Sequence, residues 1–271
     1  MQGITDLAMT AFSPLLLLLV TILDLDHASA HPELSRRNCR SKRGAAYNNS
    51  SAVSVLASGG KISWAYNWDA SSNGEPGVEF VPMMWGSRYD EETLDRIDSA
   101  VRDGSTHILG FNEPDHSEQA NMSPSDAASV YKQYITPFVD RAQLVSPATT
   151  NGADGLDWMG NFLKLCSDCE ISVMAVHWYG ATADDFKEHI TKSQTLAAQH
   201  GLDELWVTEF ALAEDMTGTV HDPTSSVEFL RQVLPWLDQQ CNIGRYAYFM
   251  TADNYLLDGT SLSQTGEAYV N

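Results

Sequence analysis

Short, almost wholly apolar segments alternate with amphipathic helical patterns along most of this chain of 271 residues, and this alternation is the feature that most limits its fold. Continuous apolar strands are typical of a parallel sheet covered by helices, because such strands are buried on both faces. The alternation therefore indicates an α/β fold. Seven strands are predicted, at residues 62–68, 78–85, 107–112, 143–148, 171–177, 205–210 and 245–251.

Helical patterns separate most of these strands. Leu94, Ile97 and Val101 recur at helical spacing, and Ser123 followed by Pro124 is typical of a helix start. Further helices are predicted at 156–163, 184–199 and 227–237. The strand and helix order predicts a compact (β/α)8 barrel of the TIM type.

A closed barrel of this type needs an eighth strand. We expect it in the turn-rich stretches 69–77 or 87–90, or in the lead-in 53–56. A doubly wound open sheet is the alternative, but that fold binds its ligand beside a glycine-rich loop, and the sequence has none.

Two of the predicted strands end in a glutamate. Glu113 follows Asn112 and precedes Pro114, which stops further strand pairing, and Glu209 ends the strand 205–210. Parallel strands present their carboxyl ends at the same mouth of a barrel, where the catalytic residues of such barrels lie. Two carboxyl groups at that mouth indicate hydrolysis of a glycosidic bond, with one as acid/base and the other as nucleophile. Two solvated strand-end carboxylates are the alternative.

Other side chains near the predicted mouth could bind a sugar. His177 and Tyr179 have the same strand parity, so both can face the mouth and orient a carboxylate, although a buried structural pair is the alternative. Asn112 could bind a sugar hydroxyl or cap a turn. Aromatic rings stack on sugar faces, and for this reason the predicted substrate-binding residues also include Trp85, Trp178 and Tyr66.

Composition narrows the classes of partner. The formal net charge is −20, which disfavours nucleic acid and anionic membranes and suits a neutral polysaccharide. The eight histidines show no His-Glu-x-x-His spacing, and no Gly-x-Ser-x-Gly motif is present. We therefore expect no metal site. We also expect no cofactor and a monomeric protein.

The first part of the chain resembles a targeting segment. Residues 1–30 contain an apolar run from Pro14 to Val20 and a small-residue site at 28–30, which predict a secretory signal peptide, with a signal anchor as the alternative. Residues 31–43 end in Lys42-Arg43 and form either a propeptide or a basic disordered segment. Residues 44–271 are expected to form one catalytic domain. The mature protein would be released from the cell or held at the cell wall.

The cysteines allow several arrangements. Cys166 and Cys169 could form a short structural disulfide, a redox pair or half of a zinc site; secretion favours the disulfide. Cys241 is then expected to be a buried free thiol, while Cys39 lies in the segment 31–43.

Several motifs together resemble glycoside hydrolase family 128, the endo-β-1,3-glucanases with an Asl1-like catalytic core. They are Leu109 to Asp115, Ala175 to Gly180, Trp206 to Ala211, Phe80 to Gly86 and Tyr246 to Asn254. The resemblance implies a compact barrel of the retaining clan in which the acid/base ends the fourth strand and the nucleophile the seventh. The seven predicted strands put them on the third and the sixth.

The resemblance also implies roles for individual residues. Glu113 would be the acid/base and Glu209 the nucleophile, Asn112 would contact the substrate near its 2-hydroxyl, and His177 and Tyr179 would line the cleft. The implied activity is cleavage of internal bonds of β-1,3-glucan. A retaining glycosidase for mannan or xylan, and a glycan-binding protein without turnover, are the alternatives.

Overall fold

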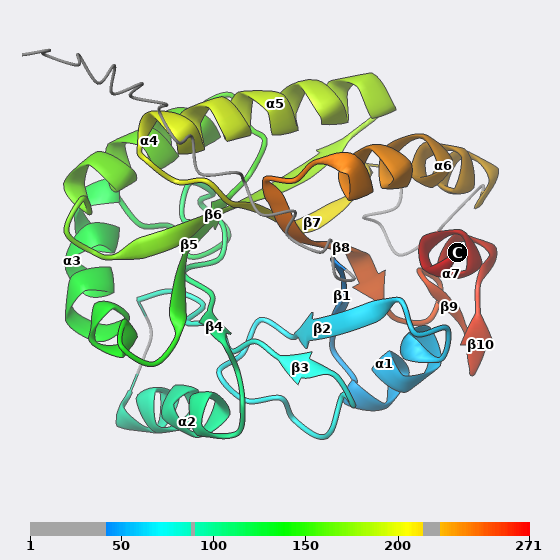
Figure 1. Cartoon of the computed structure of the whole chain (residues 1–271), viewed down its shortest axis with the longest axis horizontal. Coiled ribbons are helices and arrows are strands. Elements are labelled where there is room, and N and C mark those ends of the chain that lie inside the picture. The colour runs from blue at the N-terminus through cyan, green and yellow to red at the C-terminus, as the bar shows by residue number, and fades with distance from the viewer. Residues whose placement is uncertain (1–41, 88–89, 214–222) are drawn as a thin grey trace, which may run out of the picture. The chain divides into compact units, whose positions relative to one another are not determined.

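The computed structural model describes residues 42–87, 90–213 and 223–271. In these ranges eight strands form one sheet in which every paired neighbour is parallel. A parallel bridge between Met83 and Leu109 joins its two ends, with the Leu109 amide donating to the Pro82 carbonyl at 2.9 Å, so the sheet closes. The predicted (β/α)8 barrel is confirmed (Figure 1). The strands are β1 (Arg43–Tyr47), β2 (Ile62–Tyr66), β3 (Glu79–Phe80), β4 (His107–Ile108), β5 (Gln143–Thr149), β6 (Ile171–Gly180), β7 (Leu205–Leu212) and β8 (Ile243–Thr251).

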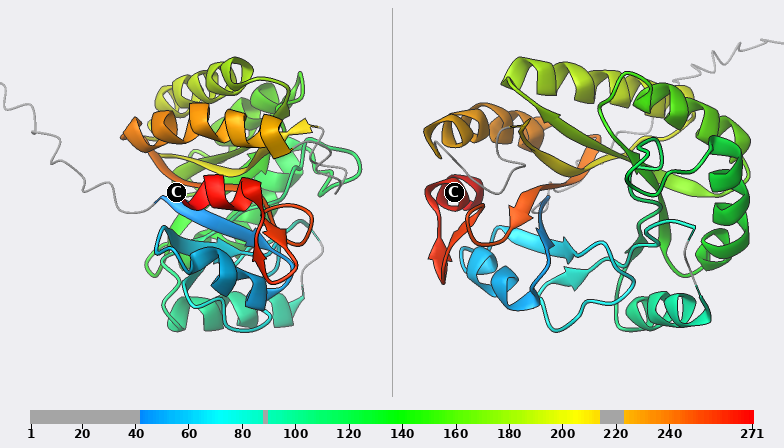
Figure 2. Two further views of the ribbon diagram at one scale, coloured as in Figure 1. Left: turned by 90° about the vertical axis from the view of Figure 1, so that its right-hand side faces the viewer. Right: turned by 180° about the vertical axis from the view of Figure 1, so that it is seen from behind.

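Helices surround this sheet on its outer side (Figures 1 and 2). The predicted N-cap of Ser123 is confirmed, since its side chain accepts a hydrogen bond from the amide of Asp126 at 3.1 Å. Two helices were not predicted, the first and the last. The helices are α1 (Ser50–Ala57), α2 (Glu91–Arg102), α3 (Pro124–Tyr134), α4 (Gly155–Leu165), α5 (Ala183–Gln199), α6 (Pro223–Gln239) and α7 (Gln264–Val270), with a 3-10 turn η1 (Thr136–Phe138) and a hairpin of β9 (Leu257–Asp258) and β10 (Ser261–Leu262).

The eighth strand lies in none of the three stretches where it was expected. It is β1, which pairs with both β2 and β8, whereas residues 53–56 belong to α1. With β1 included, Glu113 follows the fourth strand and Glu209 lies on the seventh, as the family resemblance implied.

The boundary expected between residues 43 and 44 falls inside β1. Lys42 and Arg43 are each only 7% exposed and belong to the barrel. The predicted signal peptide and residues 31–41 lie outside the described residues. Within the described ranges, no helix combines the length and the apolar character that a membrane span requires.

The end of the barrel opposite the two glutamates is closed by a charged and aromatic cluster. Arg245 lies over the ring of Trp206 at 4.6 Å and donates to Glu79 at 2.6 Å, while the hydroxyl of Thr106 donates to the other oxygen of Glu79 at 2.6 Å. Burial alone would raise the pKa of Glu79, but its contacts with His107, Arg245 and Thr106 outweigh burial and lower it to about 2. This end of a barrel commonly serves stability.

The predicted disulfide between Cys166 and Cys169 is present. It follows the end of α4, where the chain turns toward β6. The expectation for Cys241 was half right, because its thiol is free but exposed rather than buried. Cys241 follows the end of α6 in the turn before β8, a surface position in a barrel.

Candidate active site

The carboxylate of Glu113 is positioned by an unusual backbone conformation. Its amide donates to the carbonyl of Ala148 at the end of β5, at 2.8 Å, so the chain still follows the sheet at this point. Its φ is 44°, in the left-handed region that residues other than glycine rarely adopt. Pro114 follows directly. Such strain is concentrated at functional sites, where the surrounding structure maintains it.

Glu209 lies on β7 and is 5% exposed. Side chains from the loop after β2 and from β6 donate to its carboxylate: the Trp68 indole N–H reaches Oε1 at 2.7 Å, and the Tyr179 hydroxyl donates to Oε2. The hydroxyl of Tyr66 on β2 donates to the Thr208 carbonyl at 2.9 Å and lies 3.4 Å from Oε1 of Glu209. These bonds fix the carboxylate in one orientation and stabilise its negative charge.

The donors themselves remain protonated. Burial, and next the negative charge of Glu209, raise the pKa of both Tyr66 and Tyr179 well above the usual value for tyrosine. Both hydroxyls therefore keep their protons beyond the pH at which tyrosine ordinarily ionises.

His177 lies between the two glutamates and is completely buried. Its Nδ1 is 2.8 Å from Oε1 of Glu113, and its Nε2 is 3.5 Å from Oε1 of Glu209. One atom from each of the three side chains can be chosen so that all lie within 4.8 Å of one another. The two carboxyl groups therefore face the same small volume, with an imidazole in contact with both.

Charge couples these three side chains. Burial alone would lower the pKa of His177, but the carboxylates of Glu209 and Glu113 outweigh burial and raise it above its ordinary value. Burial would raise the pKa of Glu113, yet the hydrogen bond and the charge of His177 lower it below its ordinary value. The two opposite shifts favour a protonated imidazole beside an ionised Glu113 carboxylate.

A cleft of about 290 Å³ opens above both glutamates. Trp85, 36% exposed, and Asn112, 4% exposed, both line this cleft. The cleft is lined by Asn48, Trp68, Trp85, Asn112, Glu113, Gln119, Tyr179, Glu209, Phe249 and Met250.

Trp178 does not reach this cleft, and its predicted role in substrate binding is wrong. It is 2% exposed and stacks on Phe229 of α6, with ring centroids 5.6 Å apart, and meets Phe186 of α5 edge-on. Successive strand residues point to opposite faces, so Trp178 points outward while His177 and Tyr179 point into the barrel.

Five cleft residues were not predicted as site residues, namely Asn48, Trp68, Gln119, Phe249 and Met250. Trp68 follows β2 with φ 60°, and its indole N–H reaches the Glu209 carboxylate. Gln119 comes from the loop after β4 and contacts Asn112. The position of Trp68 at the end of the predicted strand 62–68 is the signal that the sequence offers for it, whereas no sequence signal marks Gln119.

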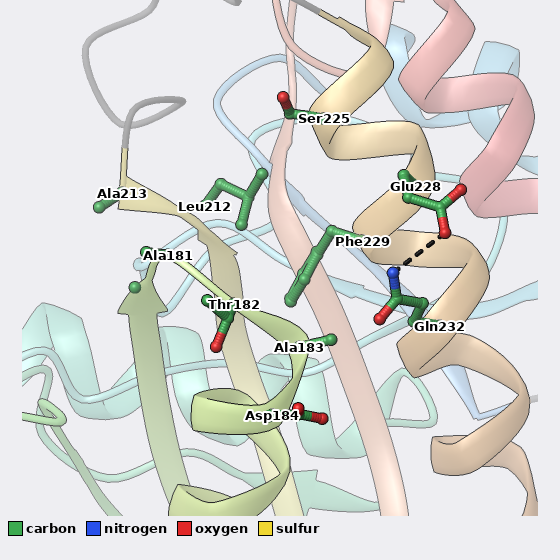
Figure 3. Close-up of a pocket in the computed structure, with 11 residues that line it drawn as sticks. Ala181, Thr182, Ala183, Asp184, Leu212, Ala213, Ser225, Glu228, Phe229 and Gln232 are labelled. Carbon is green, nitrogen blue, oxygen red and sulfur yellow. Dashed lines mark hydrogen bonds between the residues drawn. The ribbon is translucent and has the colours of Figure 1, made fainter.

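A separate cavity of about 460 Å³ lies outside the barrel wall, between α5 and α6 (Figure 3). Its acidic side chains, Asp184 and Glu228, come from different helices, and Glu228 is hydrogen-bonded to Gln232 at 3.0 Å. The cavity contains no carboxyl pair comparable to Glu113 and Glu209. Within the described ranges, the group formed by these two glutamates and His177 is also the one whose atoms are close enough to ligate a metal ion.

Comparison with known proteins agrees with this geometry. A family model described as the glycosyl hydrolase catalytic core matches residues 44–269. Alkali-sensitive linkage protein 1 of Schizosaccharomyces pombe (strain 972 / ATCC 24843) is 32% identical over 225 residues, which cover 78% of this chain and 40% of that protein. The chain thus corresponds to less than half of this relative.

Two solved structures resemble the barrel closely. A curdlan-specific exo-β-1,3-glucanase of glycoside hydrolase family 128 (subgroup III) from Blastomyces gilchristii, in complex with glucose, has a TM-score of 0.77 and 42% identity, covering 84% of this chain and 97% of that one. An endo-β-1,3-glucanase of the same family (subgroup I) from Amycolatopsis mediterranei, in complex with laminaritriose, has a TM-score of 0.70 and 26% identity, covering 85% and 98%.

Proposed function

The chain belongs to the glycosyl hydrolase catalytic core family, and on this premise we propose that it is a retaining β-1,3-glucanase with Glu113 as acid/base and Glu209 as nucleophile. The observation that carries the proposal is the close pair of carboxyl groups at the barrel mouth: one oxygen of Glu113 and one oxygen of Glu209 lie within 4.8 Å of each other. Retaining enzymes keep their carboxyl groups about 5–5.5 Å apart, whereas inverting enzymes need about 6.5–9.5 Å to admit a water molecule.

The first step transfers the sugar to the enzyme. A carboxylate oxygen of Glu209 attacks the anomeric carbon and forms an ester, while the bond to the glycosidic oxygen breaks and that oxygen takes a proton from Glu113. In the second step Glu113 removes a proton from water, the water oxygen attacks the anomeric carbon, and Glu209 leaves as a carboxylate. The configuration at the anomeric carbon is thereby retained.

His177 determines where the transferred proton is held before the first step. The low pKa of Glu113 and the raised pKa of His177 favour the proton on Nδ1, 2.8 Å from the Glu113 carboxylate. As the glycosidic bond breaks, the glycosidic oxygen gains negative charge. The proton then moves from His177 to the Glu113 carboxylate and from Glu113 to this oxygen. The pair must carry this proton for the first step to proceed.

Two modes of action have separate support. The sequence resemblance favours cleavage of internal bonds, which we take as the leading proposal. The 42% identity with an exo-acting enzyme favours release of sugars from chain ends as the second candidate. The predicted signal peptide supports secretion, and β-1,3-glucan is the substrate that the names of both similar structures indicate.

The test compares the wild-type protein, beginning upstream of Lys42, with Glu113→Gln and Glu209→Gln. Reducing ends are measured after incubation with linear β-1,3-glucan, xylan and mannan, and the exposed Glu228→Gln serves as a control. Wild-type activity confined to β-1,3-glucan and a loss of about 10³-fold or more in Glu209→Gln are expected. Full activity of Glu209→Gln would refute the mechanism.

Product analysis separates the remaining alternatives. Nuclear magnetic resonance of the first product distinguishes a β-anomer, expected for retention, from an α-anomer, which would show inversion. A ladder of oligosaccharides at early times indicates internal cleavage, whereas a single small sugar indicates cleavage from chain ends. Binding to glucan with no product from the wild type would indicate a glycan-binding protein instead.

A further inference from the structure

The side chain of Asn112 is buried beside the cleft with only one of its two polar atoms bonded. It is 4% exposed, and its backbone amide donates to the carbonyl of Trp85 at 2.8 Å. Its Nδ2 donates to Oε1 of Gln119 at 3.3 Å. Its Oδ1 has no hydrogen-bond partner among the residues that the structure describes. A buried acceptor without a partner is costly, so one is expected to be supplied by a ligand.

The loop that carries Gln119 is attached to Asn112. The Ala120 amide donates to the Asn112 carbonyl at 3.2 Å, and the Gln119 amide donates to the His116 carbonyl at 3.1 Å. These bonds return the chain to the barrel mouth, so the Gln119 side chain lies against the Asn112 amide in the wall of the cleft.

The contact between the two side-chain amides has a chemical consequence. If Oε1 of Gln119 accepts from Asn112, the Asn112 amide must point Nδ2 toward Gln119 and Oδ1 away from it. The reversed Asn112 amide would bring two acceptor oxygens together, and they repel each other. In this arrangement Gln119 therefore selects which Asn112 atom is left without a protein partner.

We propose that Gln119 is a positioning residue, which holds the Asn112 amide so that Oδ1 accepts a hydrogen bond from the sugar hydroxyl next to the cleaved bond. The inference rests on the proposed function. Hydrogen bonds to the 2-hydroxyl strengthen in the transition state of glycoside hydrolysis, so a correctly oriented acceptor speeds the reaction. Gln119 acts through Asn112 rather than by its own contact with this hydroxyl.

The test uses an aryl β-laminarioside and the same compound without the 2-hydroxyl on the sugar next to the aryl group. The measured quantity is the ratio of kcat/KM for the two compounds. Effects on folding, on the acid/base or on other sugar contacts change both values alike and cancel in this ratio.

Three variants decide between explanations. Gln119→Met removes both polar groups at similar length, and the ratio should fall about three- to tenfold, the equivalent of one neutral hydrogen bond. Gln119→Glu offers only acceptor oxygens, so it should keep the wild-type ratio. Glu118→Met, the exposed neighbour on the same loop, should also keep it.

The other outcomes contradict the proposal. An unchanged ratio in Gln119→Met would show that Gln119 does not act through the 2-hydroxyl. An equal fall in Gln119→Glu would show that Gln119 donates to Asn112, so that the orientation is reversed. If the wild type releases no aryl group from laminariosides and no sugar from glucan, the proposed function fails and this role with it. Wild-type turnover with an unchanged ratio would reject the positioning role alone.

Discussion

The first strand of the barrel begins with two buried cations, and their removal should measurably destabilise the protein. Lys42 Nζ donates to the carbonyls of Leu237, Asp238 and Gln240 at 3.2, 3.2 and 2.7 Å. These carbonyls lie at the C-terminal end of α6, where a helix leaves its last acceptors unpaired and favours positive charge. Lys42 therefore attaches β1 to the end of α6.

Arg43 makes the second attachment. Its guanidinium donates to the Asp238 carboxylate at 3.1 Å, to the Tyr246 hydroxyl at 2.9 Å and to the Tyr269 carbonyl at 2.5 Å. The Arg43 side chain is 8% exposed and that of Asp238 is 45% exposed. The ion pair itself is thus partly screened by solvent, and the two buried hydrogen bonds contribute most of the stabilisation.

Arg43→Met should lower the free energy of unfolding by about 3 kcal/mol, because it leaves a buried carbonyl and a buried hydroxyl without a donor. For a domain of this size that corresponds to a fall in Tm of about 6–12 °C. Thermal and urea unfolding, followed by near-ultraviolet circular dichroism, measure the change. The control is Arg231→Met on α6, whose side chain is 71% exposed and which should change stability by less than about 0.5 kcal/mol.

The same contacts bear on the predicted propeptide. Cleavage after Arg43 would remove both cations from β1, so we expect the folded protein to resist a protease specific for dibasic sites, and the urea-unfolded chain to be cut. Intact mass spectrometry after timed digestion distinguishes the two. Complete cleavage of the folded protein after Arg43, with Tm and activity unchanged, would refute the reasoning.

Three further changes have defined outcomes. The pKa of Glu79 is about 2 in the folded protein and about 4.5 in the unfolded chain, so its ionised carboxylate stabilises the fold by about 3 kcal/mol above pH 4.5. This stabilisation is lost as the pH falls toward 2. In Glu79→Gln, urea unfolding measured between pH 5 and 2 should show a smaller loss of stability. His177→Asn removes the group with the raised pKa that holds the catalytic proton, so the alkaline limb of kcat/KM should move to lower pH; an unmoved limb would contradict that role. Tyr179→Phe removes a donor to Glu209 and should lower kcat by about ten- to a hundredfold, with Tm as the check that the fold persists.

The barrel could be predicted because its strands are continuous apolar runs, but β1 could not. Its sequence, Arg43-Gly44-Ala45-Ala46-Tyr47, contains no β-branched residue and follows another cation, so it resembles a surface segment. Gly44 is needed because the Trp64 ring lies where a Cβ would be, 2.3 Å from its position. The burial of this strand depends on β8 as well as on β2, and the Arg43 partner Tyr246 on β8 is 203 residues away.

The side chains proposed as catalytic were predictable for a different reason. Glu113 directly follows an apolar run, Glu209 lies in the apolar strand β7, and His177 and Tyr179 have the parity that faces the barrel interior. The same parity should have excluded Trp178, which lies between them and points to the helices. Aromatic character suggested sugar stacking, whereas the period of two residues in a strand decided its direction.

Trp68 illustrates what strand parity cannot supply. If β2 continued past Tyr66, the side chains of residues 66 and 68 would point in the same direction from one face of the strand. However, β2 ends at Tyr66, and Trp68 has a left-handed backbone conformation. The Trp68 ring therefore meets the Tyr66 ring edge-on, with ring centroids 5.2 Å apart. That conformation is what allows its indole N–H to reach Oε1 of Glu209 from outside the strand, at 2.7 Å. A positive φ in a large aromatic residue is unfavourable by itself, so the contacts with Tyr66, Phe249 and Glu209 must maintain it. The conformation that places the donor is thus determined by the assembled site and not by the residues adjacent to Trp68, and only the structure could identify it.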